Sequence, residues 1–280
     1  MKKIIKFILI IVFIVGIIIA YSYFVEPKIF TYREYPIESE KITDNFKGLK
    51  IIHITDIHYG RNFDKKNLKE LIKSINDQKP DIVVLTGDLI DKKAKMTIEI
   101  ESEISKELKK ICATIGKYAI TGDQDLKFDQ WSNIITSANF INLNNTYDTI
   151  YKNGYQSILI AGVSSYSDKE DINSKLTTTT QFINSFEKEG PIYKILIMHE
   201  PDYIDEIIDN KFDLILAGHS LNGQINLPFN SFLLQKGAKK YYKNHYKIED
   251  KDLYISNGLG TTNFDFRFLN IPSYNIYRLK

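Results

Sequence analysis

The chain opens with one long apolar run and then alternates short apolar segments with longer amphipathic ones. Residues 7–25, FILIIVFIVGIIIAYSYFV, contain one conventionally polar residue, Ser22. About 19 helical residues, each rising about 1.5 Å, nearly cross the hydrocarbon core of a bilayer. A cleaved signal peptide would need a shorter apolar region and a small-residue cleavage site, and bulky aromatic residues stand there instead. We therefore expect residues 1–25 to form an uncleaved, single-pass membrane anchor.

The charges on either side of this anchor predict its orientation. Lys2, Lys3 and Lys6 precede the apolar run, whereas the charges beyond it cancel. The positive-inside rule then keeps the N-terminus in the cytoplasm and places the rest of the chain outside the plasma membrane. Residues 26–46 mix polar and aromatic types and are interpreted as a short tether. Residues 47–280 are expected to form the main domain.

From Leu49 onward the pattern favours strands and helices in turn. Strands are predicted at residues 49–58, 81–90, 117–121, 157–165, 193–200 and 213–220. Amphipathic helices are predicted at residues 65–77, 98–115, 129–138, 181–189 and 203–210. Such alternation is typical of an α/β fold. The C-terminal third is more typical of antiparallel strands, with an exposed hairpin expected around residues 236–247.

Composition narrows the classes of partner. Of 280 residues, 43% are hydrophobic, which permits a sizeable core. The 37 Lys and Arg residues nearly balance the 35 Asp and Glu residues, so no overall field favours nucleic acid, and none is expected as a partner. The single cysteine, Cys112, excludes an internal disulfide framework, and its apolar helical surroundings predict that it is buried.

Polar residues gather where the predicted strands end. A strand-end aspartate is usually a turn or cap residue and a lone histidine usually a core residue, but several together at one sheet edge indicate a binding site. Imidazoles with carboxylates suit borderline divalent ions such as Mn, Fe or Zn. The expected metal ligands are Asp56, His58, Asp88, Asp123, His199 and His219. Five further residues are expected to be structural, turn or cap residues: His53, His245, Asp91, Asp125 and Asn222.

The order of these motifs resembles the calcineurin-like metallophosphoesterase superfamily. Its motifs D-x-H, G-D-x-x-D, G-N-H-D, a lone His and G-H-x-H stand here as DIH, GDLID, GDQD, MHE and GHSL. Two further segments, GHSLNGQINLP and LYISNGLGTTNFDFRFLNIPS, resemble the membrane-tethered bacterial cell-envelope branch of that superfamily. The positions that coincide with this branch are Gly223, Gln224, Gly258, Gly260 and Arg267.

The resemblance implies a four-layer α/β/β/α sandwich that holds two metal ions. By that analogy, Asp56, His58 and a bridging Asp88 hold one ion together with the last His of G-H-x-H. Asp88, the Asn position, His199 and His219 hold the other. A hydroxide activated by both ions attacks phosphorus in line, and the histidine after the Asn protonates the leaving oxygen.

Three functional positions depart from the pattern. Asp123 replaces the ligand Asn, Gln124 replaces the acid His, and Leu221 replaces the second His of G-H-x-H. One ion keeps four candidate ligands and the other keeps three, so one or two ions are expected. Gln124 can donate a hydrogen bond but cannot deliver a proton.

The resemblance and its departures together leave two functions open. The first is a metal-dependent phosphoesterase, with Asp88 and Gln124 at catalytic positions, acting on a phosphoester or pyrophosphate bond of an envelope or lipid-linked phospho-compound. Its expected partner is a phosphorylated small molecule or lipid head group. The second is a degenerate member of the superfamily that binds metal or a phosphorylated ligand without hydrolysing it.

Overall fold

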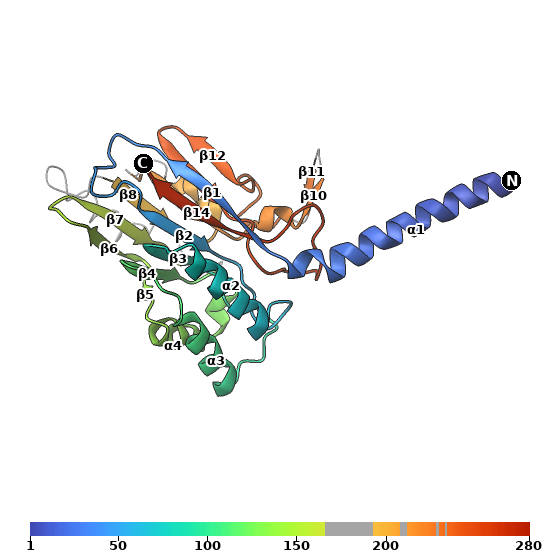
Figure 1. Ribbon diagram of the computed structural model, residues 1–280, viewed down its shortest axis with the longest axis horizontal. Coiled ribbons are helices and arrows are strands. Elements are labelled where there is room, and N and C mark those ends of the chain that lie inside the picture. The colour runs from blue at the N-terminus through green and yellow to red at the C-terminus, as the bar shows by residue number, and fades with distance from the viewer. Residues whose placement is uncertain (166–192, 208–211, 228–229, 233) are drawn as a thin grey trace.

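The computed structural model places two six-stranded β-sheets face to face, with helices outside one of them (Figure 1). It describes residues 1–165, 193–207, 212–227, 230–232 and 234–280. The first sheet runs in the order β1 Thr31–Ile37, β14 Ser273–Leu279, β2 Lys50–Ile54, β3 Ile82–Thr86, β4 Gly116–Ile120 and β5 Ile141–Asn142. The second runs in the order β12 His245–Ile248, β13 Lys251–Ile255, β9 Leu214–Ala217, β8 Tyr193–Ile197, β7 Ser157–Gly162 and β6 Thr146–Tyr151. A separate pair consists of β10 Ile225–Leu227 and β11 Asn230–Phe232.

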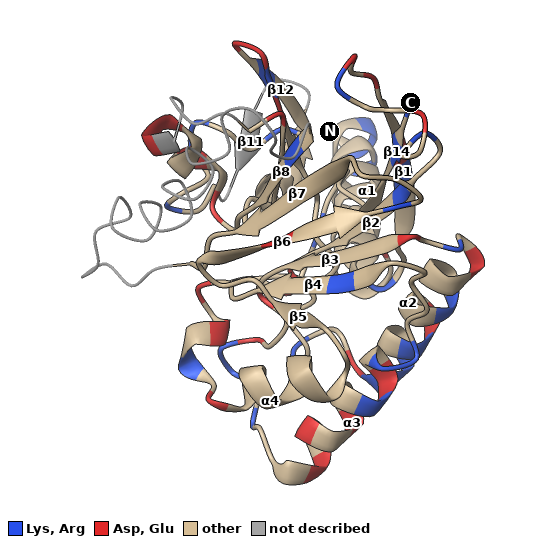
Figure 2. Cartoon of the chain, turned by 90° about the vertical axis from the view of Figure 1, so that its left-hand side faces the viewer, with Lys and Arg blue, Asp and Glu red and all other residues tan. Residues whose placement is uncertain are grey.

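The helical elements follow the same chain order. The α-helices are α1 Lys2–Phe24, α2 Lys65–Asp77, α3 Ile98–Leu108 and α4 Gln130–Ser137. The 3-10 turns are η1 Glu26–Lys28, η2 Asp125–Lys127, η3 Pro201–Ile207 and η4 Leu221–Gly223. Helix α2 has the predicted bounds, because Asp64 caps it in a capping box with Asn67. Figure 2 shows that many residues of α2 and α3 are charged.

Strand β3 shows how the layers are held together. All five residues of β3 are buried, and successive side chains point to opposite faces of the sheet. Val83 and Leu85 pack in the cluster shared with α2, α3 and α4, whereas Ile82 and Val84 pack in the cluster between the two sheets. This arrangement gives the α/β/β layers of the expected sandwich. The outer face of the second sheet carries a third cluster that includes Ile204 of η3.

Helix α1 is long and apolar enough to cross a membrane, and its apolar stretch is not buried against the domain. In Figure 1 it projects away from the domain. The expected tether, residues 26–46, is only partly a connector. Residues 31–37 form strand β1, which pairs in parallel with β14, and Ile42 and Phe46 are buried between the sheets. The alternating burial along β1 explains the difference, because an edge strand with one covered face has a mixed polar and aromatic pattern.

Other elements also differ from the predictions. Helix α3 ends at Leu108 rather than near residue 115, and Cys112 lies beyond it and is exposed, so its predicted burial is wrong. The neighbouring Ile111 takes the buried position instead. The C-terminal third is mixed rather than antiparallel, because β13 pairs with β9 in parallel. The helix expected at residues 181–189 lies outside the described residues, and that expected near residue 203 is the 3-10 turn η3.

The carboxyl ends of the central strands point toward one end of the domain. Strands β2, β3 and β4 are parallel in one sheet, and β7, β8 and β9 are parallel in the other. The base of α1 lies at this same end (Figure 1). The loops that follow these strands therefore converge at the end of the domain from which α1 projects.

Candidate metal centre

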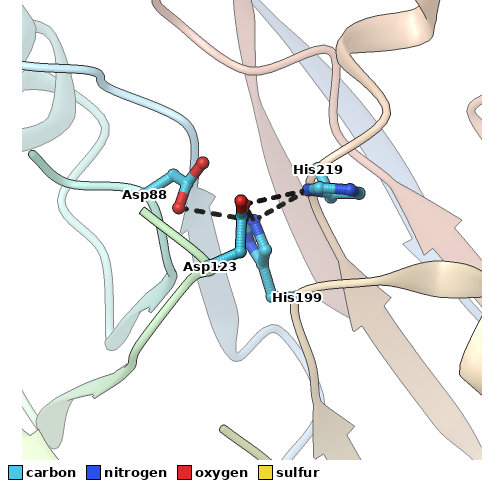
Figure 3. Close-up of side chains that lie close together, drawn as sticks. All are labelled: Asp88, Asp123, His199 and His219. Atoms are coloured by element: carbon cyan, nitrogen blue, oxygen red, sulfur yellow. Dashed lines mark hydrogen bonds and ion pairs between the residues drawn. The ribbon is translucent and has the colours of Figure 1, made fainter. Parts of the chain in front are cut away.

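The six expected metal ligands meet at this end of the two sheets. They form two groups that share Asp88, and the donor atoms within each group lie within 4.8 Å of one another. Asp88, Asp123, His199 and His219 form the four-residue group (Figure 3), and Asp56, His58 and Asp88 form the three-residue group. Each ligand lies just beyond its strand, so the strands end a few residues earlier than predicted.

The loops that carry these side chains are held in an unusual backbone conformation. Asp56, His58, Asp88 and His219 have φ angles of 51°, 50°, 52° and 63°. Residues other than glycine rarely occupy this left-handed region, and such strained residues concentrate at functional sites. The turns aim the side chains inward instead of letting them continue the alternation of a strand.

Two glycines provide the space for the carboxylates. A Cβ atom at Gly122 would lie 2.2 Å from Oδ1 of Asp88, and one at Gly218 would lie 2.7 Å from Oδ2 of Asp56. Any larger residue at either position would displace a ligand. The glycine that opens the GDQD turn is therefore required by the approach of Asp88.

The four-residue group has distances that suit a shared ion. Nε2 of His199 lies 3.6 Å from Oδ1 of Asp88 and 3.5 Å from Oδ1 of Asp123, and Nδ1 of His219 lies 3.4 Å from the same Asp123 oxygen. Two ligand atoms that each lie about 2.1 Å from one ion are separated by about 3.0 Å at right angles and about 3.4 Å at a tetrahedral angle. The side chains are therefore preorganised for a cation.

The far nitrogens of the two imidazoles strengthen this interpretation. Nδ1 of His199 lies 2.7 Å from the carbonyl oxygen of Thr86, and Nε2 of His219 lies 2.8 Å from that of Lys236. A carbonyl can only accept, so each far nitrogen carries a proton, and in the neutral tautomer the near nitrogen presents its lone pair to the group. These two near nitrogens are only 3.1 Å apart. Two lone pairs at that distance, beside carboxylates, require a cation or a proton between them.

The three-residue group is similar but less complete. Nε2 of His58 lies 3.7 Å from Oδ1 of Asp56 and 3.7 Å from Oδ2 of Asp88. Within the described part of the chain, this Asp56 oxygen and both nitrogens of His58 are buried without a hydrogen-bond partner. Unpaired buried polar atoms are costly, and a cation would satisfy them. Leu221 is buried and supplies no donor, so this group has three ligands.

Burial and mutual interaction shift the pKa values of the ligands. Burial raises the pKa of Asp88 to about 8 and lowers the pKa of His58 to about 4. Burial alone would raise the pKa of Asp123 and lower that of His199. The hydrogen bond and charge attraction between ligand carboxylates and imidazoles outweigh burial, so the pKa of Asp123 is lowered and that of His199 is raised. The acidic cluster thus takes up protons when it lacks another cation, and a divalent ion would displace them. The residues present therefore fit divalent metal.

Gln124 does not offer its side chain to this centre. Its Oε1 accepts a hydrogen bond from the backbone N–H of Lys92, and its Nε2 donates to Oγ1 of Thr262. The side chain is buried, and its backbone N–H donates to Oδ1 of Asp88. Gln124 thus fixes three loops around the centre while both ends of its amide are occupied. We interpret it as a positioning residue.

Asp91 is a turn residue, as expected, since its Oδ1 accepts a hydrogen bond from the backbone N–H of Lys93, but it also lies beside the three-residue group. Oδ2 of Asp91 lies 3.8 Å from Nδ1 of His58 and 3.7 Å from Nη1 of Arg61, and Arg61 in turn pairs with Asp265. The facing atoms of Asp91 and His58 have no hydrogen-bond partner. A carboxylate behind a ligating imidazole orients the ring and raises its basicity. The sequence predicted the turn but not the approach of Asp91 to His58.

Replacement of Asp91 by asparagine is expected to weaken metal binding by about 10- to 100-fold, because the imidazole of His58 loses its charged neighbour. Titration of the metal-free protein with Mn²⁺, followed by calorimetry, measures this change. Asp148→Asn is a matched control, because Asp148 accepts a hydrogen bond from Tyr118 outside both ligand groups. Equal affinities for the two variants would contradict a positioning role for Asp91.

The residues expected to be structural lie where that expectation put them. His53 is buried and contacts Tyr277 and Thr86, and His245 pairs with Asp252 on the β12–β13 hairpin. Asp125 accepts hydrogen bonds from the backbone N–H groups of Ile90 and Gly122. None of these residues belongs to either ligand group among the residues the structure describes.

Comparisons with known proteins agree with the geometry of the site. The family model described as Calcineurin-like phosphoesterase matches residues 49–223. The uncharacterized metallophosphoesterase YkuE of Bacillus subtilis is 29% identical over 265 residues, covering 93% of this chain and 89% of that protein. YkoQ, an uncharacterized metallophosphoesterase of the same organism, is 28% identical, covering 83% and 84%. The UDP-2,3-diacylglucosamine pyrophosphatase LpxG of Chlamydia trachomatis is 22% identical, covering 76% and 78%.

Proposed function

This chain belongs to the calcineurin-like phosphoesterase family, and we propose that it is an active, divalent-metal-dependent hydrolase of pyrophosphate or activated phosphoester bonds. The observation that carries the proposal is the pair of lone-pair nitrogens of His199 and His219, 3.1 Å apart beside Asp88 and Asp123. A divalent cation between these nitrogens would satisfy both lone pairs and the neighbouring carboxylates. Mn, Fe and Zn fit this mixture of nitrogen and oxygen donors.

The ligands also define where a substrate would approach. The side chains of Asp56, His58, Asp88, His199 and His219 are at most 5% exposed, whereas that of Asp123 is 45% exposed. The centre therefore opens to solvent past Asp123. When bound, divalent metal would supply a nucleophile at neutral pH and neutralise charge on the phosphoryl oxygens. The chain itself contributes carboxylates and imidazoles that are already placed to hold the metal.

The nature of the leaving group follows from Gln124. An amide cannot protonate a departing alkoxide, and this one is already engaged at both ends. General acid catalysis is worth about 10² to 10⁴ in rate, so alkoxide leaving groups lose that factor. A phosphate leaving group departs without protonation, since its second pKa is about 6.

We expect kcat/KM for a pyrophosphate diester or an aryl phosphodiester to exceed that for a matched alkyl phosphate by about 10² or more, because the missing acid penalises only the alkyl ester. The measurement compares these substrates with the full-length protein in detergent and saturating Mn²⁺. Equal turnover of the alkyl ester would refute the leaving-group preference. No turnover of any ester, with metal bound, would favour the alternative function.

That alternative, a module that binds metal or a phosphorylated ligand without hydrolysis, is favoured by Leu221. Its side chain leaves the three-residue group one ligand short. A centre that holds one ion still binds phosphate but loses the clamp that stabilises both the attacking and leaving oxygens. Metal content by elemental mass spectrometry separates the two functions when it is measured on the same samples as turnover.

The membrane context supports an envelope or lipid-linked substrate. Helix α1 can span a bilayer, and the relative LpxG is named for cleaving a pyrophosphate in a diacylated sugar nucleotide. We place residues 1–25 as the anchor in the plasma membrane, with the N-terminus in the cytoplasm and the domain on the outer side. The ligand would then be a phosphorylated lipid head group or a soluble phospho-compound of the envelope.

A further inference from the structure

The end of helix α1 is bonded directly to the loop formed by residues 263–271. The backbone N–H of Arg267 donates to the carbonyl oxygen of Ser22 at 3.0 Å, and the side chain of Ser22 is buried. Carbonyls in the last turn of a helix have no partner within the helix, and here the loop provides one. The loop therefore reaches the helix two residues before its end at Phe24.

A second contact locks the chain just after the helix. Glu26 is 1% exposed, and its Oε1 accepts a hydrogen bond from the backbone N–H of Asn270 at 2.5 Å. The side chain of Asn270 then donates to the carbonyl oxygen of Leu221 at 2.6 Å. Arg267 is fully buried and donates to the carbonyl oxygens of Gly258 and Gly260. These hydrogen bonds thus tie the end of the helix to the domain.

The loop that makes these contacts exposes large apolar side chains. Phe264, Leu269 and Ile271 are 51%, 57% and 39% exposed, and all three lie in the loop 263–271. They flank the buried Arg267, which is bonded to Ser22 in the helix, and Asn270, which is bonded to Glu26 just after it. Water is a poor environment for three such apolar side chains in one short loop, whereas the end of a membrane-spanning helix lies in the lipid interface.

We propose that Phe264, Leu269 and Ile271 form a membrane-seating rim that inserts into the lipid interface around the base of α1. The occupant of the rim is the bilayer that α1 crosses, since the bond between Arg267 and Ser22 brings the loop to the level of the last helical turn. Tyr23 and Phe24 are exposed at the same level and suit the headgroup region. The domain therefore sits against the membrane in one orientation instead of swinging on a tether.

The contacts of Arg267 with Ser22 and of Asn270 with Glu26 also fix the position of the metal centre relative to the lipid surface. Gly260, whose carbonyl oxygen binds Arg267, donates its N–H to the carbonyl oxygen of Asp56 at 2.6 Å. Two residues thus connect the end of the anchor to a metal ligand. The centre lies at the same end of the domain as the base of α1, so a phosphate carried on a lipid head would meet it there.

A depth measurement on the full-length protein tests this inference without requiring activity. Leu269→Cys in a Cys112→Ser background carries a single environment-sensitive fluorophore, and the protein is reconstituted into phosphatidylglycerol vesicles that contain spin-labelled lipid. We expect a blue-shifted emission and loss of most of the fluorescence. Ile271→Cys in the same background provides a second position in the rim.

The native Cys112 provides the matched control. It is exposed and precedes the amino end of β4, whereas the metal centre lies at the carboxyl ends of the strands. A fluorophore on Cys112 should keep its emission and remain unquenched in the same vesicles. Quenching at neither rim position, or equal quenching at all three positions, would overturn the proposal. Because the readout is lipid contact, loss of the proposed hydrolytic function would leave this result unchanged.

Discussion

Replacement of Asp88 by asparagine is expected to weaken metal binding at both ligand groups and to lower turnover by about 10³-fold or more. Asp88 is the one residue that the two groups share. An amide oxygen is a weaker ligand than a carboxylate, and the change removes a negative charge from each group. Metal ions contribute several kcal/mol of transition-state stabilisation, and each 1.36 kcal/mol corresponds to a factor of about ten.

The fold should survive this change. Asparagine keeps an oxygen at the position that accepts the backbone N–H of Gln124, and it fits the space beside Gly122. Replacement also removes a buried carboxyl whose pKa is raised to about 8, which relieves a cost of the metal-free protein. Thermal unfolding in excess chelator should therefore be similar for the variant and the parent protein.

Metal content and turnover, measured together, decide the outcome. The parent protein should bind one or two ions, and Asp88→Asn should bind fewer and show a Mn²⁺-dependent rate lower by about 10³-fold or more. Asp148→Asn carries the same chemical change outside both groups and should behave as the parent protein. Retention of full metal content and activity by Asp88→Asn would show that the two groups are not the catalytic centre.

The ligands could be predicted from the sequence because each follows a strong apolar strand. Apolar runs such as IIHI and VVL fix where the strands lie, and parallel strands bring their carboxyl ends to one edge. Asp56, His58 and Asp88 therefore had to lie near one another. The same logic failed for residues 31–37, because an edge strand with one face exposed carries the composition of a loop.

Contacts between distant segments could not be predicted in this way. The positioning role of Gln124 depends on its contacts with Lys92 and Thr262. The attachment of the anchor to the domain depends on Glu26 and Asn270, which are 244 residues apart. No local periodicity encodes such pairs. The left-handed backbone at Asp88 is also set by the surrounding packing, since local propensity disfavours it.

Restoring histidine at both departed positions, with Leu221→His and Gln124→His together, is expected to raise the rate on alkyl phosphates by about 10² to 10⁴ and to change pyrophosphate cleavage little. Leu221 lies next to the three-residue group, since a Cβ atom placed on Gly258 would meet both Leu221 and Asp56. An imidazole at 221 would give that group a fourth ligand. An imidazole at 124 would supply the missing proton.

The two single variants separate these contributions. Leu221→His alone should lower the Mn²⁺ concentration needed to fill the three-residue group, without changing the preference for good leaving groups. Gln124→His alone should gain less on alkyl phosphates than the double variant does, because the three-residue group still lacks its fourth ligand. In either variant the change at 124 also breaks the hydrogen bonds to Lys92 and Thr262, at a cost of about 1–3 kcal/mol in the free energy of unfolding. Thermal unfolding of each variant measures that cost. If the double variant binds two ions yet hydrolyses no ester, the chain lacks more of the catalytic apparatus than two histidines, and the binding-module function becomes the better explanation.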